Sequence, residues 1–371
     1  MASGEGSDPG AFLAGKQVAV DPGKIERELA RLWKPAGAAD TTPSVTRAAV
    51  SNLVIHLEEG DAPERARETV LTVGRRFPSR IFLLTRGAAP PSPDGGAISA
   101  YVSAVCHLPS PGSPPVCCEE ITLELAPGES PELFGGAVLS LLIADLPVIL
   151  LSPGPRPDAL LDVLDDAVDR VVLDSRVAAP SGLEALRRLF AERPTISVDD
   201  LAWRGTLSWR RVLCSLHDDP DARQLFRGLR SVTVGYENEG GASAGARSAL
   251  LAGWLLSRLG WRPLGGSRFG KNGGVLEARL VPEEIRGAEP GAITRIRVES
   301  GGPGSTSFLQ VSRPAAGDYL RIEHHTSEAC VLPRMVPAKI ETEADLVGTA
   351  LERVTDQDVL REAVEVARLM G

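Results

Sequence analysis

The sequence predicts two domains, an N-terminal α/β domain over residues 41–199 and a C-terminal α+β domain over residues 200–371. Residues 1–40 are expected to form a flexible N-terminus and a first helix. Three observations predict this organisation. A chain of 371 residues exceeds what one hydrophobic core normally organises. Apolar strand cores alternate with helical patterns in the first half, and several strands follow one another in the second half.

The first half reads as alternating elements after a helix at Ile25–Trp33 that ends near Pro35. In chain order the pattern predicts a strand at 51–57, a helix at 62–77, strands at 77–84, 97–107 and 117–125, a helix at 131–142, a strand at 143–151, a helix at 158–165, a strand at 170–175 and a helix at 181–190. The strands at 97–107 and 117–125 alternate in polarity across a Pro-rich turn, which favours antiparallel pairing. The sheet is therefore predicted to be mixed, mainly parallel and covered by helices on both faces.

The second half has a different order of elements. It predicts a helix at 208–217, a strand at 231–236, a helix at 246–259 and strands at 275–281, 292–299, 307–312, 319–325 and 329–332. Gly and Pro turns between these strands are typical of an antiparallel meander. Two terminal helices close the chain, and each is expected to begin with a capping box, Thr342 with Asp345 and Thr355 with Asp358.

Composition indicates a cytoplasmic protein that binds neither nucleic acid nor membranes. The net charge is −9, and the start of the chain lacks the basic and apolar regions of a secretory signal. The longest apolar run, Ala137–Leu151, is too short to span a bilayer. The five Cys follow no disulfide framework and no CxxC pattern, which favours a reducing compartment. Cys117 and Cys118 are expected to face opposite sides of a strand in structural roles.

The segment DLAWRGTLSWRRVL, Asp200 to Leu213, combines two of the five Trp with three Arg. Large aromatic rings beside Arg are typical of a domain junction or a partner surface. We therefore predict a partner interface at Trp203, Arg204, Trp209, Arg210 and Arg211. The alternative is that the Trp side chains fill the core of the second domain, because Trp is usually mostly buried.

One local pattern suggests a serine hydrolase. Residues 241–245 read GxSxG around Ser243, with Asp318, His324 and His325 downstream. A nucleophile elbow needs its serine directly after a strand, and four polar or glycine residues, 237–240, intervene here. The two acidic residues among them would also oppose a developing oxyanion. A flexible lead-in to the following helix is the favoured interpretation.

Two other patterns suggest ligand sites but fit them poorly. Residues 265–272 resemble a Walker A loop, yet Asn272 replaces the magnesium-binding hydroxyl and no helix pattern follows, so a hairpin is favoured over a nucleotide-binding module. His324 and His325 are consecutive strand residues and cannot both bind one metal without a bulge. The sequence therefore predicts no catalytic residue, no cofactor and no metal.

Several motifs together carry a resemblance to a known family. They are SNLVIHL, FPSRIFLL, CCEEITLEL, IADLPVILL, RVVLDS, the DLAW and SWRR parts of residues 200–213, and LLAGWLLSRLGW at 250–261. From about Val50 to Leu369 the chain resembles the glucose-6-phosphate dehydrogenase assembly protein family, known as OpcA. The resemblance implies a non-catalytic protein that binds glucose-6-phosphate dehydrogenase, promotes its active oligomer and supports NADPH production in the oxidative pentose phosphate pathway. The chain departs from the family in the loops at 87–96 and 109–115, and no Cys can be matched to thiol-based control.

Overall fold

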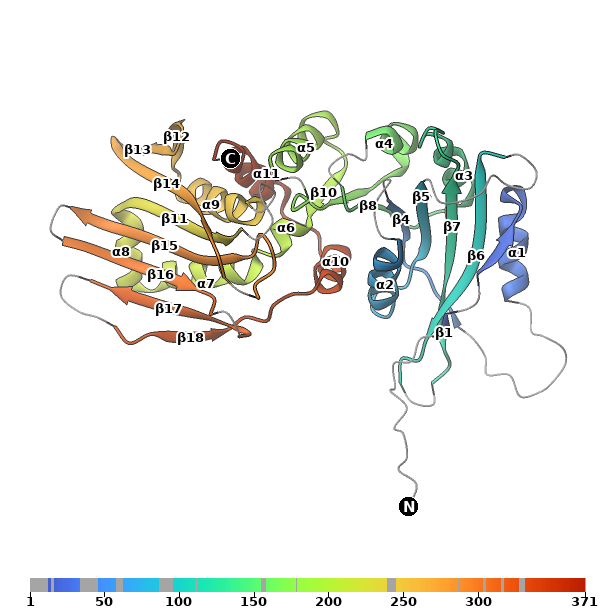
Figure 1. The fold of residues 1–371 in the computed structure, drawn as a ribbon, viewed down its shortest axis with the longest axis horizontal. Coiled ribbons are helices and arrows are strands. Elements are labelled where there is room, and N and C mark those ends of the chain that lie inside the picture. The colour runs from blue at the N-terminus through green and yellow to red at the C-terminus, as the bar shows by residue number, and fades with distance from the viewer. Residues whose placement is uncertain are drawn as a thin grey trace, which may run out of the picture. The chain divides into compact units, whose positions relative to one another are not determined.

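The computed structural model describes residues 13–14, 17–33, 46–57, 63–86, 96–110, 113–154, 158–177, 179–238, 245–285, 287–302, 305–314, 317–326 and 331–370. Packing divides the chain into two units (Figure 1). Unit 1 comprises Met1–Val172 and Glu343–Arg353, and unit 2 comprises Leu173–Thr342 and Val354–Gly371. Within the described residues, no helix is both long and apolar enough to cross a membrane.

Unit 1 is built around one mixed sheet. Its elements are β1 Leu13–Ala14, β2 Val18–Val20, η1 Pro22–Lys24, α1 Ile25–Leu32, β3 Thr46–Arg47, β4 Asn52–His56, α2 Pro63–Gly74, β5 Arg80–Arg86, β6 Ile98–His107, β7 Val116–Leu125, α3 Leu133–Leu141, β8 Val148–Ser152, α4 Asp158–Leu164, η2 Asp165–Ala167, β9 Arg170–Leu173 and α10 Glu343–Glu352. The strand order is β1-β6-β7-β5-β4-β8-β9, with β2 beside β6 and β3 beside β7.

The central strands of this sheet are parallel and its edge is antiparallel. β4 pairs in parallel with β5 and β8, and β5 pairs in parallel with β7. β6 pairs antiparallel with β7, as the alternation in their sequences predicted. Every residue of β4 and β8 is buried, which explains their continuous apolar runs. The predicted mixed, mainly parallel α/β fold is confirmed.

A disulfide joins β6 to β7, contrary to the expectation from the cysteine spacing. Cys106 and Cys117 are direct partners in the antiparallel register and are bonded through their Sγ atoms. The expectation was wrong because a separation of eleven residues matches no motif, whereas pairing of the two strands places the two Cβ atoms side by side. Cys118, the next residue, is buried and free.

Unit 2 combines a second sheet with a layer of helices. Its elements are α5 Ala179–Glu192, β10 Ser197–Asp200, α6 Leu201–Arg204, α7 Leu207–Asp218, α8 Pro220–Arg227, β11 Leu229–Glu237, α9 Ala246–Arg258, β12 Arg262–Gly265, β13 Arg268–Lys271, β14 Gly274–Glu283, β15 Ile293–Gly302, β16 Ser305–Ser312, β17 Tyr319–His325, β18 Arg334–Pro337 and α11 Gln357–Ala367. The sheet has the order β12-β13-β14-β11-β15-β16-β17-β18.

The unit 2 sheet is antiparallel at every described strand pair except β11 and β14, which are parallel and connected through α9. The predicted α+β class is therefore confirmed. The last predicted strand was misplaced, because β18 occupies 334–337 and residues 331–333 are outside any strand. The capping box at Thr355 was also wrong. Thr355 is buried, and the Asp356 carboxylate accepts the helix-opening bond from the amide of Val359 instead.

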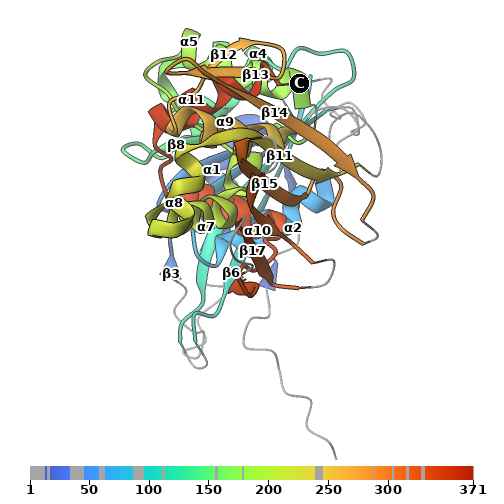
Figure 2. The ribbon, with the colours of Figure 1, turned by 90° about the vertical axis from the view of Figure 1, so that its left-hand side faces the viewer.

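Helices cover one face of the unit 2 sheet. α8 packs on β15 and β16. α9 packs on β11 and β14, which lie beside it in the turned view of Figure 2. α9 also packs closely against α11. This approach requires glycine at position 253, because a Cβ there would lie 2.3 Å from the carbonyl oxygen of Ala363. The core of unit 2 thus lies between the sheet and these helices.

Candidate functional sites

The Trp/Arg segment begins at a buried carboxylate that joins β10 to α6. Asp200 accepts hydrogen bonds from the amide of Trp203 at 3.0 Å and from the amide and hydroxyl of Ser175 at 2.8 and 2.9 Å. It therefore serves as the N-cap of α6. Its side chain is fully buried, and this burial, assisted by the nearby Asp174 carboxylate, raises the pKa of Asp200 to about 7.

The neighbouring carboxylate holds the first arginine of the segment. The Nε of Arg204 donates to both carboxylate oxygens of Asp199 at 3.0 Å, and both residues are buried. Burial raises the pKa of Asp199, although the guanidinium of Arg204 opposes the shift. Arg204 is thus part of an internal ion pair.

The remaining predicted interface residues differ in exposure. Trp203 and Trp209 are buried in unit 2, as are Trp254 and Trp261, so these rings fill its core. The guanidinium of Arg210 lies 3.6 Å from the centre of the Trp203 ring, and burial lowers the pKa of this half-buried arginine to about 10. Within the segment, Arg211 is the exposed arginine.

A line of alternating charges continues from this buried centre. Arg176 pairs with Asp174 through its Nε at 2.7 Å and its Nη2 at 2.6 Å, and its Nη1 lies 3.3 Å from Glu289. Glu289 also accepts from Nη1 of Arg247 at 2.9 Å. Sequence reasoning missed this network because its members are distant in the chain. A signal in the sequence was the acidic pair Asp199 and Asp200, which immediately precedes a helix.

The sheet of unit 1 has the strand order at which doubly wound folds bind dinucleotides. β4 has β5 on one side and β8 on the other, so the order in which successive strands are added to the sheet reverses at β4. His56 and Ser152 end these two strands and are buried. The connection from β4 to α2, residues 57–62, reads LEEGDA and so supplies three carboxylates and one glycine. A pyrophosphate needs close backbone approach and positive potential there. Residues 58–62 lie outside the described part of the chain, and their sequence lacks the glycine-rich pattern of such a turn.

The structure describes only a part of the groups of the hydrolase hypothesis. Ser243 lies outside the described residues. The Asp318 carboxylate accepts a hydrogen bond from the amide of Ile340 at 2.9 Å. His324 and His325 are consecutive residues of β17, as expected, and therefore point to opposite faces of the sheet. Among the described residues there is no group of three or more potential metal ligands.

The Walker-like residues form a hairpin, as favoured from the sequence. β12 and β13 pair antiparallel, and β13 turns into β14 through Asn272 and Gly273, both with positive φ. Lys271 donates its Nζ hydrogen bond to the carbonyl oxygen of Leu259 at 2.6 Å. A phosphate-binding loop would instead connect a strand to a helix N-terminus.

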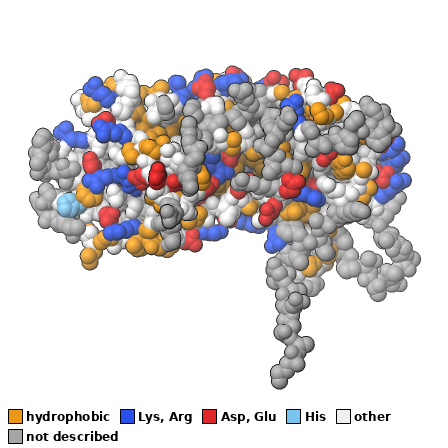
Figure 3. All heavy atoms as spheres, in the orientation of Figure 1, with side chains coloured by type: hydrophobic (Ala, Val, Ile, Leu, Met, Phe, Trp, Pro, Cys, Tyr) orange, Lys and Arg blue, Asp and Glu red, His pale blue; other side chains and the backbone are white. Residues whose placement is uncertain are grey.

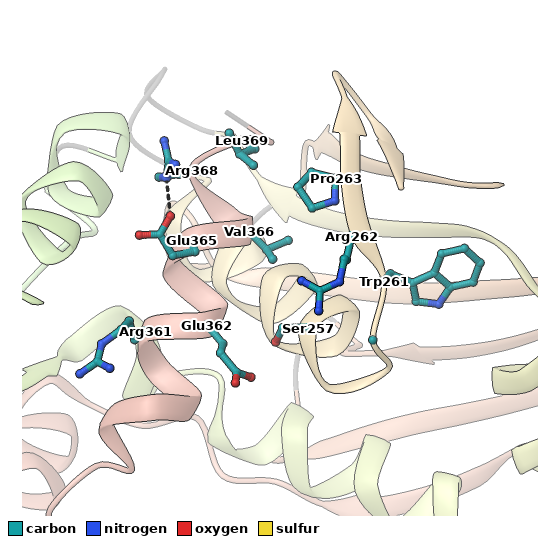
Figure 4. Close-up of a pocket in the computed structure, with 11 residues that line it drawn as sticks. Ser257, Trp261, Arg262, Pro263, Arg361, Glu362, Glu365, Val366, Arg368 and Leu369 are labelled. Carbon is teal, nitrogen blue, oxygen red and sulfur yellow. Dashed lines mark hydrogen bonds and ion pairs between the residues drawn. The ribbon is translucent and has the colours of Figure 1, made fainter. Parts of the chain in front are cut away.

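A surface pocket of about 460 Å³ lies between α11 and the end of α9 within unit 2 (Figure 4). Its charged lining residues are Arg262, Arg361, Glu362, Glu365 and Arg368. Glu365 pairs with Arg368 at 2.9 Å, so a part of this charge is already neutralised. The ring of Trp261 points away from the space towards which Arg262 extends (Figure 4). This mixture of opposed charges defines no reaction chemistry.

The fold and these sites define a two-domain α/β protein whose first unit is doubly wound and whose Trp/Arg segment contains an internal ion pair. Residues 71–190 match the model of the glucose-6-phosphate dehydrogenase subunit N-terminal domain, and residues 196–364 match that of the C-terminal domain. The chain therefore belongs to the glucose-6-phosphate dehydrogenase assembly protein family, OpcA.

A similar curated protein supports the family. The chain is 24% identical over 289 residues to the "Putative OxPP cycle protein OpcA" of Synechococcus elongatus, which covers 72% of this chain and 63% of the relative, less than two thirds of its length. An oxidoreductase from Sinorhizobium meliloti is 11% identical over 87% of this chain and 96% of its own, with a TM-score of 0.46. An aldose-aldose oxidoreductase from Caulobacter crescentus is 11% identical over 84% and 94%, with a TM-score of 0.42. Structural similarity this low carries no argument about activity.

Proposed function

We propose that this chain is a non-catalytic factor that binds glucose-6-phosphate dehydrogenase and promotes its active oligomer in the oxidative pentose phosphate pathway. One observation carries the proposal: both units match domains of a family described as a subunit of that dehydrogenase. The name of the Synechococcus elongatus relative refers to the same pathway.

The residues at the dinucleotide position of unit 1 support the non-catalytic part of the proposal. A dehydrogenase holds the pyrophosphate of its cofactor on a glycine-rich turn and a helix N-terminus. In this chain the sequence between β4 and α2 contains Glu58, Glu59 and Asp61, whose negative charge disfavours a pyrophosphate. Asp200 and Arg204 of the Trp/Arg segment are buried and bind the amide of Trp203 and the carboxylate of Asp199, so they support the fold and are not available to a substrate.

Activation by such a factor requires differential affinity. A binder shifts an oligomer equilibrium only by binding the active arrangement more tightly than the inactive one. About 1.4 kcal/mol of such difference changes the ratio tenfold. Because Trp203, Arg204 and Trp209 are buried, the part of the predicted interface that can contact the enzyme directly is Arg211 with the exposed part of Arg210.

The test is the activity and the oligomeric mass of the same organism's dehydrogenase, measured with and without this chain by NADPH production and light scattering. Faster turnover together with a mixed complex supports the proposal. Absence of both overturns it. Arg211→Glu is expected to raise the concentration needed for half-maximal activation about tenfold without lowering the melting temperature. The matched control is Arg188→Glu on α5, also an exposed helical arginine, which should activate like the wild type.

A further inference from the structure

A hollow of about 500 Å³ lies on the surface of unit 2 beside the β12–β13 hairpin. We call it the hairpin hollow. Its lining residues come from β12, from β13 and the turn after it, and from the start of β14, together with Gly260, which follows α9. Four of its nine lining residues are glycines, so main-chain atoms form a large part of its wall. A ligand can therefore approach the main chain closely here.

Arg262 supplies an uncompensated positive charge to the hairpin hollow. Its guanidinium has no hydrogen-bond or ion-pair partner within the described part of the chain. The residue also lines the pocket of Figure 4, whose two glutamates already pair with Arg258 and Arg368. The Arg262 guanidinium is therefore available to a ligand.

Lys271 supplies a second positive charge, and no described residue that lines the hollow is acidic. Its Nζ donates to the carbonyl oxygen of Leu259 at 2.6 Å, which is a neutral acceptor and leaves two N–H donors of the ammonium group. Arg262 is the register partner of Gly270, the residue before Lys271, so the two cations lie on neighbouring strands. Residues 261–280 contain four basic residues and one Glu, although the whole chain carries −9. The hollow is therefore a positive site on an acidic protein.

The turn between β13 and β14 adds two main-chain donors. Asn272 and Gly273 have positive φ values of 49° and 79°, and both residues line the hollow. Their amides donate no hydrogen bond within the described residues. A Cβ on Gly273 would meet nothing within 4 Å, so no atom covers this residue on that side. Successive free amides in a turn form a concavity that binds anions.

Leu264 and Val275 give the hollow apolar walls. Their side chains are 59% and 46% exposed, so a bare inorganic ion leaves them in water, whereas a ligand with a carbon skeleton covers them. Figure 3 shows Lys and Arg side chains beside hydrophobic ones over these strands, at the upper left of the view. A phosphate monoester carries a charge of about −1.5 to −2 near neutral pH, which matches two cations better than the single charge of a carboxylate does. These properties together fit an organic phosphate.

We propose that the hairpin hollow binds the phosphate monoester of a small organic molecule. Arg262 and Lys271 hold the phosphate oxygens through charge-assisted hydrogen bonds, and the amides of Asn272 and Gly273 donate to the same group. The two apolar side chains cover the carbon skeleton of the ligand. This arrangement differs from a Walker loop, because side chains and a hairpin turn hold the phosphate in place of a helix N-terminus. The site performs no reaction, and it does not depend on the proposed function.

The test measures binding to the full chain by isothermal titration calorimetry at low ionic strength. The probes are two monoesters, glucose 6-phosphate and phenyl phosphate, with inorganic phosphate as the bare anion and glucose as the uncharged compound. At least one monoester should bind more tightly than inorganic phosphate, and glucose should not bind. Arg262→Gln and Lys271→Gln should each weaken the binding of that monoester about tenfold. The matched control is Arg268→Gln, because Arg268 is an exposed arginine of the same hairpin that does not line the hollow.

The outcomes separate a built site from diffuse attraction to a basic hairpin. Monoester binding that Arg262→Gln weakens at an unchanged melting temperature, while Arg268→Gln binds like the wild type, supports the proposal. Arg262→Gln keeps the test decisive if Lys271→Gln unfolds on losing its bond to Leu259. Absence of monoester binding, monoester binding no tighter than that of inorganic phosphate, or equal weakening by Arg262→Gln and Arg268→Gln overturns it. Activation of the dehydrogenase is assayed separately, so each of these failures leaves the proposed function standing.

Discussion

Replacing Asp200 should destabilise unit 2 through the hydrogen bonds that its carboxylate accepts. Asp200→Ala removes the N-cap of α6, which costs about 1 kcal/mol. It also leaves the buried amide and hydroxyl of Ser175 without their acceptor, at 2.8 and 2.9 Å in the wild type. An unpaired buried donor costs about 1–3 kcal/mol. The free energy of unfolding should therefore fall by about 2–4 kcal/mol.

The same carboxylate should make the stability depend on pH. Burial raises the pKa of Asp200 from its ordinary 3.8 to about 7, so between these values the folded state retains a proton that the unfolded chain releases. The free energy of unfolding consequently decreases as pH rises from about 4 to 7. A shift of about three units corresponds to about 4 kcal/mol as an upper bound. The side chain of Asp200→Asn is neutral at every pH, so this variant should be less stable than the wild type at pH 5. At pH 8 its deficit in the free energy of unfolding should be smaller, or the variant should be the more stable of the two.

The assay is chemical unfolding followed by Trp fluorescence, because four of the five Trp lie in unit 2. The matched control is Asp356→Ala, which removes the exposed cap of α11 and should cost about 1 kcal/mol. Two results would refute the reasoning. One is an Asp200→Ala variant no less stable than Asp356→Ala, and the other is an Asp200→Asn variant with the same pH slope as the wild type.

Two further predictions concern packing and cross-linking. Gly253→Ala should lower the free energy of unfolding by about 2 kcal/mol or more, because its Cβ would lie 2.3 Å from the carbonyl oxygen of Ala363. The control is Gly348→Ala, whose Cβ meets nothing within 4 Å and which should raise the free energy of unfolding by up to about 1 kcal/mol. Equal melting temperatures of the two variants would contradict both expectations. Reducing the disulfide between Cys106 and Cys117, which are eleven residues apart in the sequence, should lower the free energy of unfolding by about 3 kcal/mol. The measurement is chemical unfolding with and without reductant. An unchanged unfolding midpoint would show that the disulfide adds no stability.

The sheets could be predicted from the sequence because burial determines their patterns. The all-apolar runs of β4 and β8 require cover on both faces, and the alternation in β15 and β16 requires cover on one. The positions of β18 and of the α11 cap could not be predicted as well. Thr355 and Asp356 are both good caps, and only their difference in burial decides between them.

The environment of the Trp/Arg segment could not be predicted because the same residue types suit a core and an interface. Arg204 can be buried because Asp199, five residues earlier, neutralises it, and this depends on the turn from β10 into α6. Residue spacing alone does not specify that turn. The disulfide between Cys106 and Cys117 was missed for a similar reason, since it depends on strand register.

The motif that most specifically identifies the family therefore determines the interior of unit 2. Asp200, Trp203 and Arg204 bind one another or their immediate neighbours, so their pattern identifies a way of joining β10 to α6. Family membership consequently predicts this local structure more directly than it predicts a contact surface. A surface that recognises another protein must use exposed side chains, and within the Trp/Arg segment Arg211 is the exposed arginine. Partner binding and folding should accordingly respond to different substitutions, even though one sequence motif led to both hypotheses.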